Sequence, residues 1–222
     1  EKVTAANADP PGSGFLPDFR TIPGTGNGYL DFGTNGADKS LTNSRFTWSK
    51  DYKQVTVSFW ANMPKETSGI NVPTFGVGPA AGYDSFSAGW TGTLIWDYGY
   101  ITRNGRIEVD YSTACQGNAN CYNKWTHIVL VSNGVSTKKI YINGKLVVEN
   151  NVATAAGHPE VESSGIFSDA QLNEIFIGRA KNTWRITQFF RGNLDEFMIY
   201  NKVLTADEIK RIYDIQKSKF GV

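Results

Sequence analysis

Residues 191–209 read RGNLDEFMIYNKVLTADEI, a pattern that predicts an apolar strand, a short turn and a helix with a defined start. Thr205 has the side chain of a natural helix N-cap, and Glu208, three residues later, completes a capping box. Apolar residues then recur with helical spacing, so we expect a helix over about residues 206–215. This segment gives the strongest helix signal in the chain.

The strand within this segment carries acidic residues among apolar ones. Alternation groups Asp195 with Phe197 and Ile199 on the inward face of a sheet. A carboxylate that faces a core needs a partner there. The adjacent Glu196 is predicted to point to the opposite face, so these two carboxylates are not expected to act as a pair.

Turn signals divide most of the remaining chain into short strands at intervals of roughly ten residues, as in a β-sandwich. Asn143-Gly144 and Asn104-Gly105 each predict a two-residue hairpin, because Asn-Gly suits the positive φ angles of a tight β-turn. The Asn104-Gly105 turn would join strands at residues 98–103 and 106–111. The pattern therefore indicates an all-β protein built largely of antiparallel neighbours.

The chain has 222 residues, a length that suits one all-β domain. Residues 1–27 are rich in Pro, Gly and Asn and predict a linker and irregular lead-in, which Phe15, Leu16 and Phe19 would attach to the body. Residues 28–222 form the predicted domain. With 22 basic and 21 acidic residues the net charge is +1, and the chain shows neither a basic stripe nor a long apolar run. We therefore expect neither nucleic-acid binding nor a membrane span.

Two cysteines, Cys115 and Cys121, flank a short polar segment. We favour a disulfide that closes a surface loop in an oxidising compartment, with two free thiols as the alternative. A metal site here is less favoured, because the nearby His127 belongs to an apolar segment. The chain has no Asn-x-Ser/Thr sequon, which favours a bacterial surface or periplasmic origin.

Several segments together resemble one protein family. Residues 28–32 look like its first core strand, and residues 55–61 look like its strand of pattern T-h-S-h-W, in which h is apolar. Residues 124–131 and 139–146 form the most specific pair, and residues 174–178 precede the C-terminal strand and helix. On these residues the chain resembles the laminin-G-like branch of the concanavalin A-like lectin/glucanase superfamily.

The resemblance implies an all-β fold: a two-sheet antiparallel jelly-roll sandwich (concanavalin A-like) with a short C-terminal helix packed on its edge. It says less about function, since one scaffold hosts many sites. Function therefore has to be argued from the residues that could form a site.

A catalytic role is not favoured. Relatives of the family-16 glucanase type use a Glu-x-Asp-x-x-Glu pattern on one strand, and this chain has no such pattern. Glu108 and Asp110 share a strand face, which we interpret as the solvated side of a hairpin. His127, in a strand, and His158, in a loop, form no grouping suited to nucleophilic catalysis. We predict that the protein is not an enzyme and keep a divergent glycoside hydrolase as an alternative.

A carbohydrate site combines aromatic rings, which stack on sugar C–H faces, with planar polar groups that bridge hydroxyls. Trp90 and Trp184 lie in predicted loops, where aromatic residues are binding candidates. Trp96, Tyr98 and Tyr100 would share one face of a strand, either as a sugar-binding ladder or as part of the sandwich core. The predicted carbohydrate-binding residues are Trp90, Trp96, Tyr98, Tyr100, Arg103 and Trp184.

Many members of the superfamily carry a structural calcium ion, held by an Asp of the last strand and by early loop carbonyls. Asp195 falls at the matching position, and the Gly-rich segment 33–38 offers carbonyl oxygens. The resemblance therefore implies a possible structural calcium with Asp195 as a metal ligand; the alternative is that Asp195 caps backbone N–H groups. Asp31 is out of phase with its apolar neighbours and is predicted to face solvent.

These observations predict a non-catalytic carbohydrate-binding, lectin-like module of a bacterial secreted, periplasmic or cell-surface protein. The expected partner is a poly- or oligosaccharide. Because laminin-G-like modules also bind proteins, a protein-interaction or adhesion domain is the first alternative, and a divergent glycoside hydrolase is the second.

Overall fold

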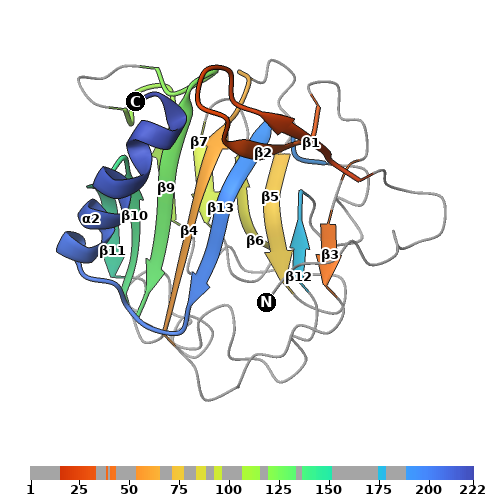
Figure 1. The fold of residues 1–222 in the computed structure, drawn as a ribbon. Coiled ribbons are helices and arrows are strands. Elements are labelled where there is room, and N and C mark those ends of the chain that lie inside the picture. Colours follow the sequence, from red (N-terminus) through yellow and green to blue (C-terminus); the bar gives the residue numbers. More distant parts are fainter. Residues whose placement is uncertain are drawn as a thin grey trace.

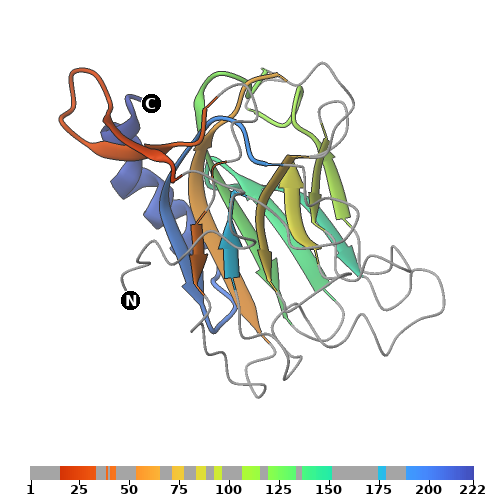
Figure 2. The same ribbon diagram turned by 90° about the vertical axis from the view of Figure 1, so that its right-hand side faces the viewer.

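The computed structural model describes residues 16–33, 39, 41–43, 54–65, 72–77, 84–88, 93–96, 107–115, 120–133, 137–151, 175–178 and 189–222. These residues form two antiparallel β-sheets that lie face to face, with a helical segment against the outside of one sheet (Figures 1 and 2). The arrangement confirms the predicted all-β sandwich with a C-terminal helix.

The first sheet has seven strands, which are, from one edge to the other, β1 (Asp18–Thr21), β2 (Gly28–Asp31), β13 (Asn193–Tyr200), β4 (Val55–Asn62), β9 (Trp125–Ser132), β10 (Thr137–Ile142) and β11 (Lys145–Asn151). β4 and β9 lie near the centre and are buried along almost their whole length. A strand that is apolar on both faces needs cover on both, which here comes from the second sheet and from the helical segment.

The second sheet has six strands, which are, in spatial order, β3 (Leu41–Asn43), β12 (Ile175–Ile177), β5 (Val72–Val77), β6 (Asp84–Ala88), β7 (Thr93–Trp96) and β8 (Ile107–Asp110). In β8, Ile107 and Val109 pack into the core while Glu108 and Asp110 are exposed. This alternation confirms that one face of the strand is wet, as the sequence predicts.

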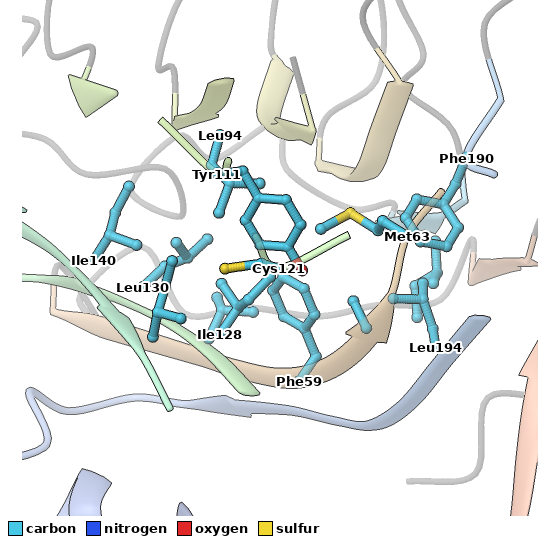
Figure 3. Close-up of a cluster of buried hydrophobic side chains, with 14 of the residues drawn as sticks. Phe59, Met63, Leu94, Tyr111, Cys121, Ile128, Leu130, Ile140, Phe190 and Leu194 are labelled. Carbon is cyan, nitrogen blue, oxygen red and sulfur yellow. The ribbon is translucent and has the colours of Figure 1, made fainter. Parts of the chain in front are cut away.

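The main hydrophobic core fills the space between the two sheets (Figure 3). Phe59 of β4 and Ile128 and Leu130 of β9 contribute from the first sheet, and Leu94 of β7 contributes from the second. Each such side chain contributes about 1.5–3 kcal/mol when it is fully buried. The sandwich is therefore held mainly by this one apolar layer.

Asn143 and Gly144 turn the chain between β10 and β11, as predicted. Both have a positive φ, 51° and 75°, which is the geometry of a type I′ hairpin turn. Ile142 and Lys145 pair directly across the turn. The side chain of Asn143 also anchors the turn, because its Oδ1 accepts a hydrogen bond of 3.0 Å from the backbone N–H of His127.

The other predicted hairpin, at Asn104-Gly105, would bring Thr102 opposite Ile107, and it stays a prediction. On the described side of β8, β7 is its antiparallel neighbour, and Trp96 lies opposite Ile107. The turn residues themselves, and the strand predicted before them, lie outside the described residues.

The predicted irregular lead-in contains a strand, because β1 pairs with β2 along its whole length. Leu16 and Phe19 do not attach this segment to the body, since they are 57% and 76% exposed. Ile22 does so instead: it is buried in one cluster with Phe220, near the C-terminus. Phe15 lies outside the described residues. Figure 2 shows the β1–β2 hairpin projecting at the end of the molecule where the C-terminus lies.

The helix α2 (Ala206–Gln216) begins where the sequence predicts it, and the 3-10 helix η4 (Lys217–Phe220) continues it. The hydroxyl of Thr205 accepts a hydrogen bond of 3.2 Å from the N–H of Glu208, and the Glu208 carboxylate accepts one of 2.8 Å from the N–H of Thr205. Both halves of the capping box are therefore present.

The helix lies across a face of the first sheet and not at its edge, which corrects the expected position (Figure 1). Leu204 and Ile209 pack on Val129 and Val131 of β9 and on Tyr141 of β10. These outward-facing side chains are themselves apolar and need cover, and the apolar stripe of α2 provides it.

Candidate functional site

The exposed face of β8 follows the predicted sugar-binding residues Trp96 to Arg103 in the sequence, and the structure describes its side chains. Asp110 Oδ1 accepts hydrogen bonds from the Ser112 hydroxyl at 2.6 Å and from the Ser112 N–H at 2.8 Å. These two bonds lower the pKa of Asp110, so this exposed carboxyl is held ionised. An ionised carboxylate accepts hydrogen bonds from sugar hydroxyls readily, whereas a glycosidase general acid requires a raised pKa.

Among the residues predicted to bind carbohydrate, the structure describes the backbone of Trp96, the last residue of β7. Its side chain lies outside the described part, so the sugar-binding ladder and the sandwich core both stay predictions for Trp96. The other predicted residues lie outside the described part of the chain: Trp90, Tyr98, Tyr100, Arg103 and Trp184.

The predicted disulfide between Cys115 and Cys121 is confirmed, with Cα atoms 5.5 Å apart. It lies on the connection that leaves β8 in the second sheet and enters β9 in the first. Tyr111 and Tyr122 pack edge to face at 5.1 Å in the same core cluster as Cys121, and burial raises the pKa of Tyr111. The bond thus fixes the crossover between the sheets directly after the exposed carboxylates of β8.

Strand β13 does not alternate regularly at its acidic residues. Its register with β4 shifts after Asp195, and Glu196 has a φ of 51°, so the chain forms a β-bulge. Leu194 and Phe197 pack into the core, whereas Asp195 and Glu196 both pair with Lys219 of η4 on the outer side. The prediction that Asp195 faces inward was therefore wrong. The prediction that Asp195 and Glu196 point to opposite faces was also wrong.

The bulge gives Asp195 its partners. Asp195 Oδ1 accepts a hydrogen bond of 2.8 Å from the N–H of Glu196, and Oδ2 lies 3.1 Å from Lys219 Nζ as an ion pair. Burial raises the pKa of Asp195 and outweighs these two stabilising contacts. Burial also disfavours the charge on Lys219, but the two carboxylates outweigh it and raise the pKa of Lys219. The alternative in which Asp195 caps a backbone N–H is therefore confirmed.

The surroundings of Asp195 do not fit the calcium site that the resemblance implies. Calcium takes six to eight hard oxygen ligands, whereas the neighbours of Asp195 here are an ammonium and an amide N–H. Across the described residues, no group of three or more His, Cys, Asp or Glu side chains could hold a metal ion. Residues 34–38, which were expected to supply carbonyl ligands, lie outside the described part, and calcium elsewhere in the domain stays a prediction.

The β1–β2 hairpin carries a series of ion pairs along the edge of the first sheet. Arg20 Nε lies 2.5 Å from Asp31 Oδ2, and a second nitrogen of Arg20 lies 3.3 Å from Asp18. Lys39 Nζ lies 3.0 Å from the same Asp18 oxygen. Asp31 also accepts a hydrogen bond of 2.8 Å from the N–H of Gly33. Asp31 is therefore paired and half-buried, which corrects the prediction that it faces solvent.

The sequence did not reveal the aromatic cluster beneath the helical segment. Trp60 of β4 is fully buried, and its ring lies 4.2 Å from that of Phe220 and 5.2 Å from that of His127. Its indole Nε1 donates a hydrogen bond of 2.8 Å to the side chain of Gln216. The sequence did offer one signal that this face is covered. The successive outward positions of β4 carry uncharged residues, Ser58 and Trp60. Trp60 is therefore a packing residue.

Most of the chain matches a single family model, that of the concanavalin A-like lectin/glucanases superfamily, over residues 26–210. The chain belongs to this superfamily. Membership confirms the resemblance drawn from the sequence, and it agrees with the two antiparallel sheets that the structure shows.

Several clostridial proteins are similar to this superfamily member. Botulinum neurotoxin type C from Clostridium botulinum C phage is 27% identical over 123 residues, which are 52% of this chain and 9% of the toxin. The solved binding domain of botulinum neurotoxin serotype G has a TM-score of 0.64 and 19% identity, covering 93% of this chain and 46% of that one.

The binding domain of botulinum neurotoxin DC has been solved in complex with rat synaptotagmin II and in complex with SialylT. These two structures have TM-scores of 0.59, are 18% and 20% identical, and each cover 90% of this chain and 45% of theirs. At such identities the likeness establishes a shared fold. The chain spans about half the length of these solved binding domains and a small part of the whole toxin.

Proposed function

We propose that this chain is a non-catalytic, lectin-like module that binds a poly- or oligosaccharide outside the cell. The observation that carries the proposal is a wet, carboxylate-bearing strand face on β8 in a member of a lectin and glucanase superfamily. The similar binding domain of botulinum neurotoxin DC, solved in complex with SialylT, also supports glycan binding.

The proposed site lies around the β7–β8 end of the second sheet. Asp110 supplies an ionised acceptor that Ser112 holds in place. The predicted aromatic and cationic residues are close to these strands in sequence, since Trp90 precedes β7 and Arg103 lies between β7 and β8. Such a set provides stacking surfaces and hydroxyl partners together, which is the chemistry that sugar recognition requires.

The spacing of the acidic residues and the pKa of Asp110 favour binding without catalysis. The chain has no Glu-x-Asp-x-x-Glu pattern, and the low pKa of Asp110 is unsuited to a general acid. A divergent glycoside hydrolase would release reducing sugar from a polysaccharide, and Glu108→Gln or Asp110→Asn would abolish that release. We expect no release by the unmodified protein.

A glycan array probed with the folded protein tests the proposal. We expect binding to a subset of glycans, and we expect Asp110→Ala to weaken it, because a charge-assisted hydrogen bond contributes about 1.5–3 kcal/mol. Glu149→Gln is the matched control, since Glu149 is an exposed carboxylate on the first sheet, paired with Lys139. A blank array from folded protein, with and without EDTA, would contradict glycan binding.

Protein binding is the second candidate, and the edge of the first sheet favours it. β1 forms this edge, all four of its residues are exposed, and Phe19 is 76% exposed. The similar DC binding domain has been solved in complex with rat synaptotagmin II. A protein partner whose binding is lost on Phe19→Ser and kept on Asp110→Ala would support this candidate over the first.

An extracellular location is part of the proposal. The Cys115–Cys121 disulfide is typical of an oxidising compartment, and the similar proteins are domains of toxins. In the described residues, none of the helices has the length and apolar character needed to cross a bilayer. Mass spectrometry of the protein from its native compartment tests this point: an intact disulfide is expected, and two free thiols would contradict it.

A further inference from the structure

His127 of β9 is buried between the first sheet and the helical segment that covers it. The residue has no exposed surface. Its ring lies 5.2 Å from that of Trp60 on the neighbouring strand β4 and 6.1 Å from that of Tyr213 on α2, at interplanar angles of 30° and 20°. The imidazole is therefore part of the contact by which α2 is held on the sheet.

The hydrogen bonds around the ring suit a neutral imidazole and not a protonated one. Nε2 shares a hydrogen bond of 2.9 Å with the hydroxyl of Ser58, whereas Nδ1 is buried and has no partner. An imidazolium has two N–H donors and needs an acceptor for each. The second proton would have no acceptor while α2 remains in place, and an unmatched buried charge is strongly unfavourable.

Among the described residues, the elements packed around His127 provide no compensating negative charge. The backbone turn at Asn143 offers an amide oxygen that already accepts the N–H of His127, and α2 offers the neutral phenol of Tyr213. The Gln216 amide oxygen is taken by Trp60.

Several charged groups of these elements pair with one another: Lys219 of η4 with Asp195 and Glu196 of the β13 bulge, and Lys210 of α2 and Lys217 of η4 with Asp214 of α2. Burial alone lowers the pKa of His127 from 6.5 to about 4, with no charged group contributing.

We propose that His127 makes the cover of the first sheet, formed by α2 and η4, acid-sensitive. Protonation of its imidazole releases this cover from the outer face while the sandwich core stays folded. The two regions are separable because the core between the sheets is one cluster, whereas Leu204, Ile209, Tyr213 and Phe220 of the cover belong to two others. Release exposes Trp60 and lets water reach both ring nitrogens.

The direction and size of the effect follow from linkage. Well above pH 6.5 His127 is neutral in both the covered and the released state, so it has no effect on their balance. As the pH falls toward 4, only the released state takes up the proton, and the covered state loses relative stability. At pH 5 the population of the released state is roughly 30-fold higher than at neutral pH.

Two carboxylates of the cover stay ionised in this range. Hydrogen bonds from Lys202 and Thr205 lower the pKa of Glu208 to about 2, and those from Lys210 and Lys217 lower the pKa of Asp214. The partly buried Asp195, with its raised pKa, protonates at a higher pH than they do, which weakens its pair with Lys219. The variant His127→Gln separates the effect of protonating His127 from the effect of protonating Asp195.

The test is amide hydrogen exchange of the full chain at pH 7.5 and pH 5.0, corrected for intrinsic exchange rates. Protection of residues 206–220 is expected to fall about 30-fold at the lower pH, while the amides of β4 and β9, which exchange only through global unfolding, remain more protected than residues 206–220 at both pH values. In His127→Gln this loss of protection is expected to shrink to threefold or less, whereas His158→Gln behaves like the unmodified chain. An equal loss in His127→Gln, or full protection of residues 206–220 in the unmodified chain at pH 5.0, would overturn the proposal.

An NMR titration of the His127 ring in the unmodified protein keeps the proposal testable if His127→Gln does not fold. The ring is expected to stay neutral as long as the cover is protected. A ring that becomes protonated above pH 6 while residues 206–220 remain protected would overturn it.

Discussion

Replacing Phe220 by alanine tests whether aromatic packing holds the C-terminal segment on the first sheet. Phe220 is 4% exposed. Its ring stacks on Trp60 at 4.2 Å with an interplanar angle of 16°, and it contacts Trp125 at 4.9 Å. Ile22 of the β1–β2 hairpin belongs to the same cluster. The substitution therefore removes a side chain shared by η4, β4, β9 and the hairpin.

The expected loss follows from these contacts. Burial of a phenylalanine side chain contributes about 1.5–3 kcal/mol, and a well-placed aromatic pair adds about 0.5–1.5 kcal/mol. Large-to-small substitutions of buried aromatic residues cost about 3–5 kcal/mol. Because η4 is short and can settle partly into the space, we take the lower end, about 3 kcal/mol, as the expected fall in the free energy of unfolding.

Urea unfolding followed by tryptophan fluorescence, with the disulfide intact, measures this loss. Ile215→Ala is the matched control, because Ile215 lies on the adjoining helix α2 and is 68% exposed. It should change the free energy of unfolding by no more than about 0.5 kcal/mol. A loss below about 1 kcal/mol for Phe220→Ala, or an equal loss for Ile215→Ala, would refute the assigned role of the aromatic cluster.

Substitutions at three further places probe other parts of the fold. Replacing Cys115 and Cys121 by serine opens a loop with a sequence separation of 6, which should lower the free energy of unfolding by about 2 kcal/mol in urea titrations; no change would argue against a stabilising disulfide. Thr205→Ala removes the helix cap and should cost about 1 kcal/mol, while Thr205→Ser should restore most of it. Gly192→Ala would place a Cβ 2.3 Å from the carbonyl oxygen of Asn62 at a φ of 115°, so we expect little folded protein by circular dichroism, and a native melting temperature would contradict the described backbone.

The sequence predicted those features that depend on local chemistry. Asn143-Gly144 predicted its hairpin because only a few residue types suit positive φ at both positions. Thr205 and Glu208 predicted the helix start because the capping box is formed by two side chains three residues apart. The family resemblance predicted the sandwich because it rests on strand patterns across most of the chain.

Features that depend on tertiary contacts were missed. The bulge at Glu196 has a non-glycine residue at positive φ, which leaves no turn signal in the sequence, and it moved Asp195 to the other face. Lys219 became the partner of both carboxylates through a contact 23 residues away from Glu196. The position of α2 was missed for the same reason, because only the assembled sheet shows that the outward side of β9 needs cover.

The candidate site was predicted in part. The wet face of β8 and the disulfide that follows it are as expected. The pairing of Trp96 with Ile107 could not be deduced from a turn signal eight residues further along the chain. The aromatic residues expected to contact sugar, apart from the backbone of Trp96, lie outside the described residues and remain predictions.

The most direct test of the proposed function is isothermal titration of the folded chain with a glycan selected on the array. The account predicts saturable binding that weakens about five- to tenfold in Trp90→Ala, the size expected for loss of one stacking contact. Phe19→Ala, which removes an exposed aromatic side chain at the far edge of the first sheet, should bind like the unmodified chain. Absence of binding heat from folded protein with every selected glycan, or equal weakening in both variants, would contradict a glycan site at the β7–β8 end of the domain.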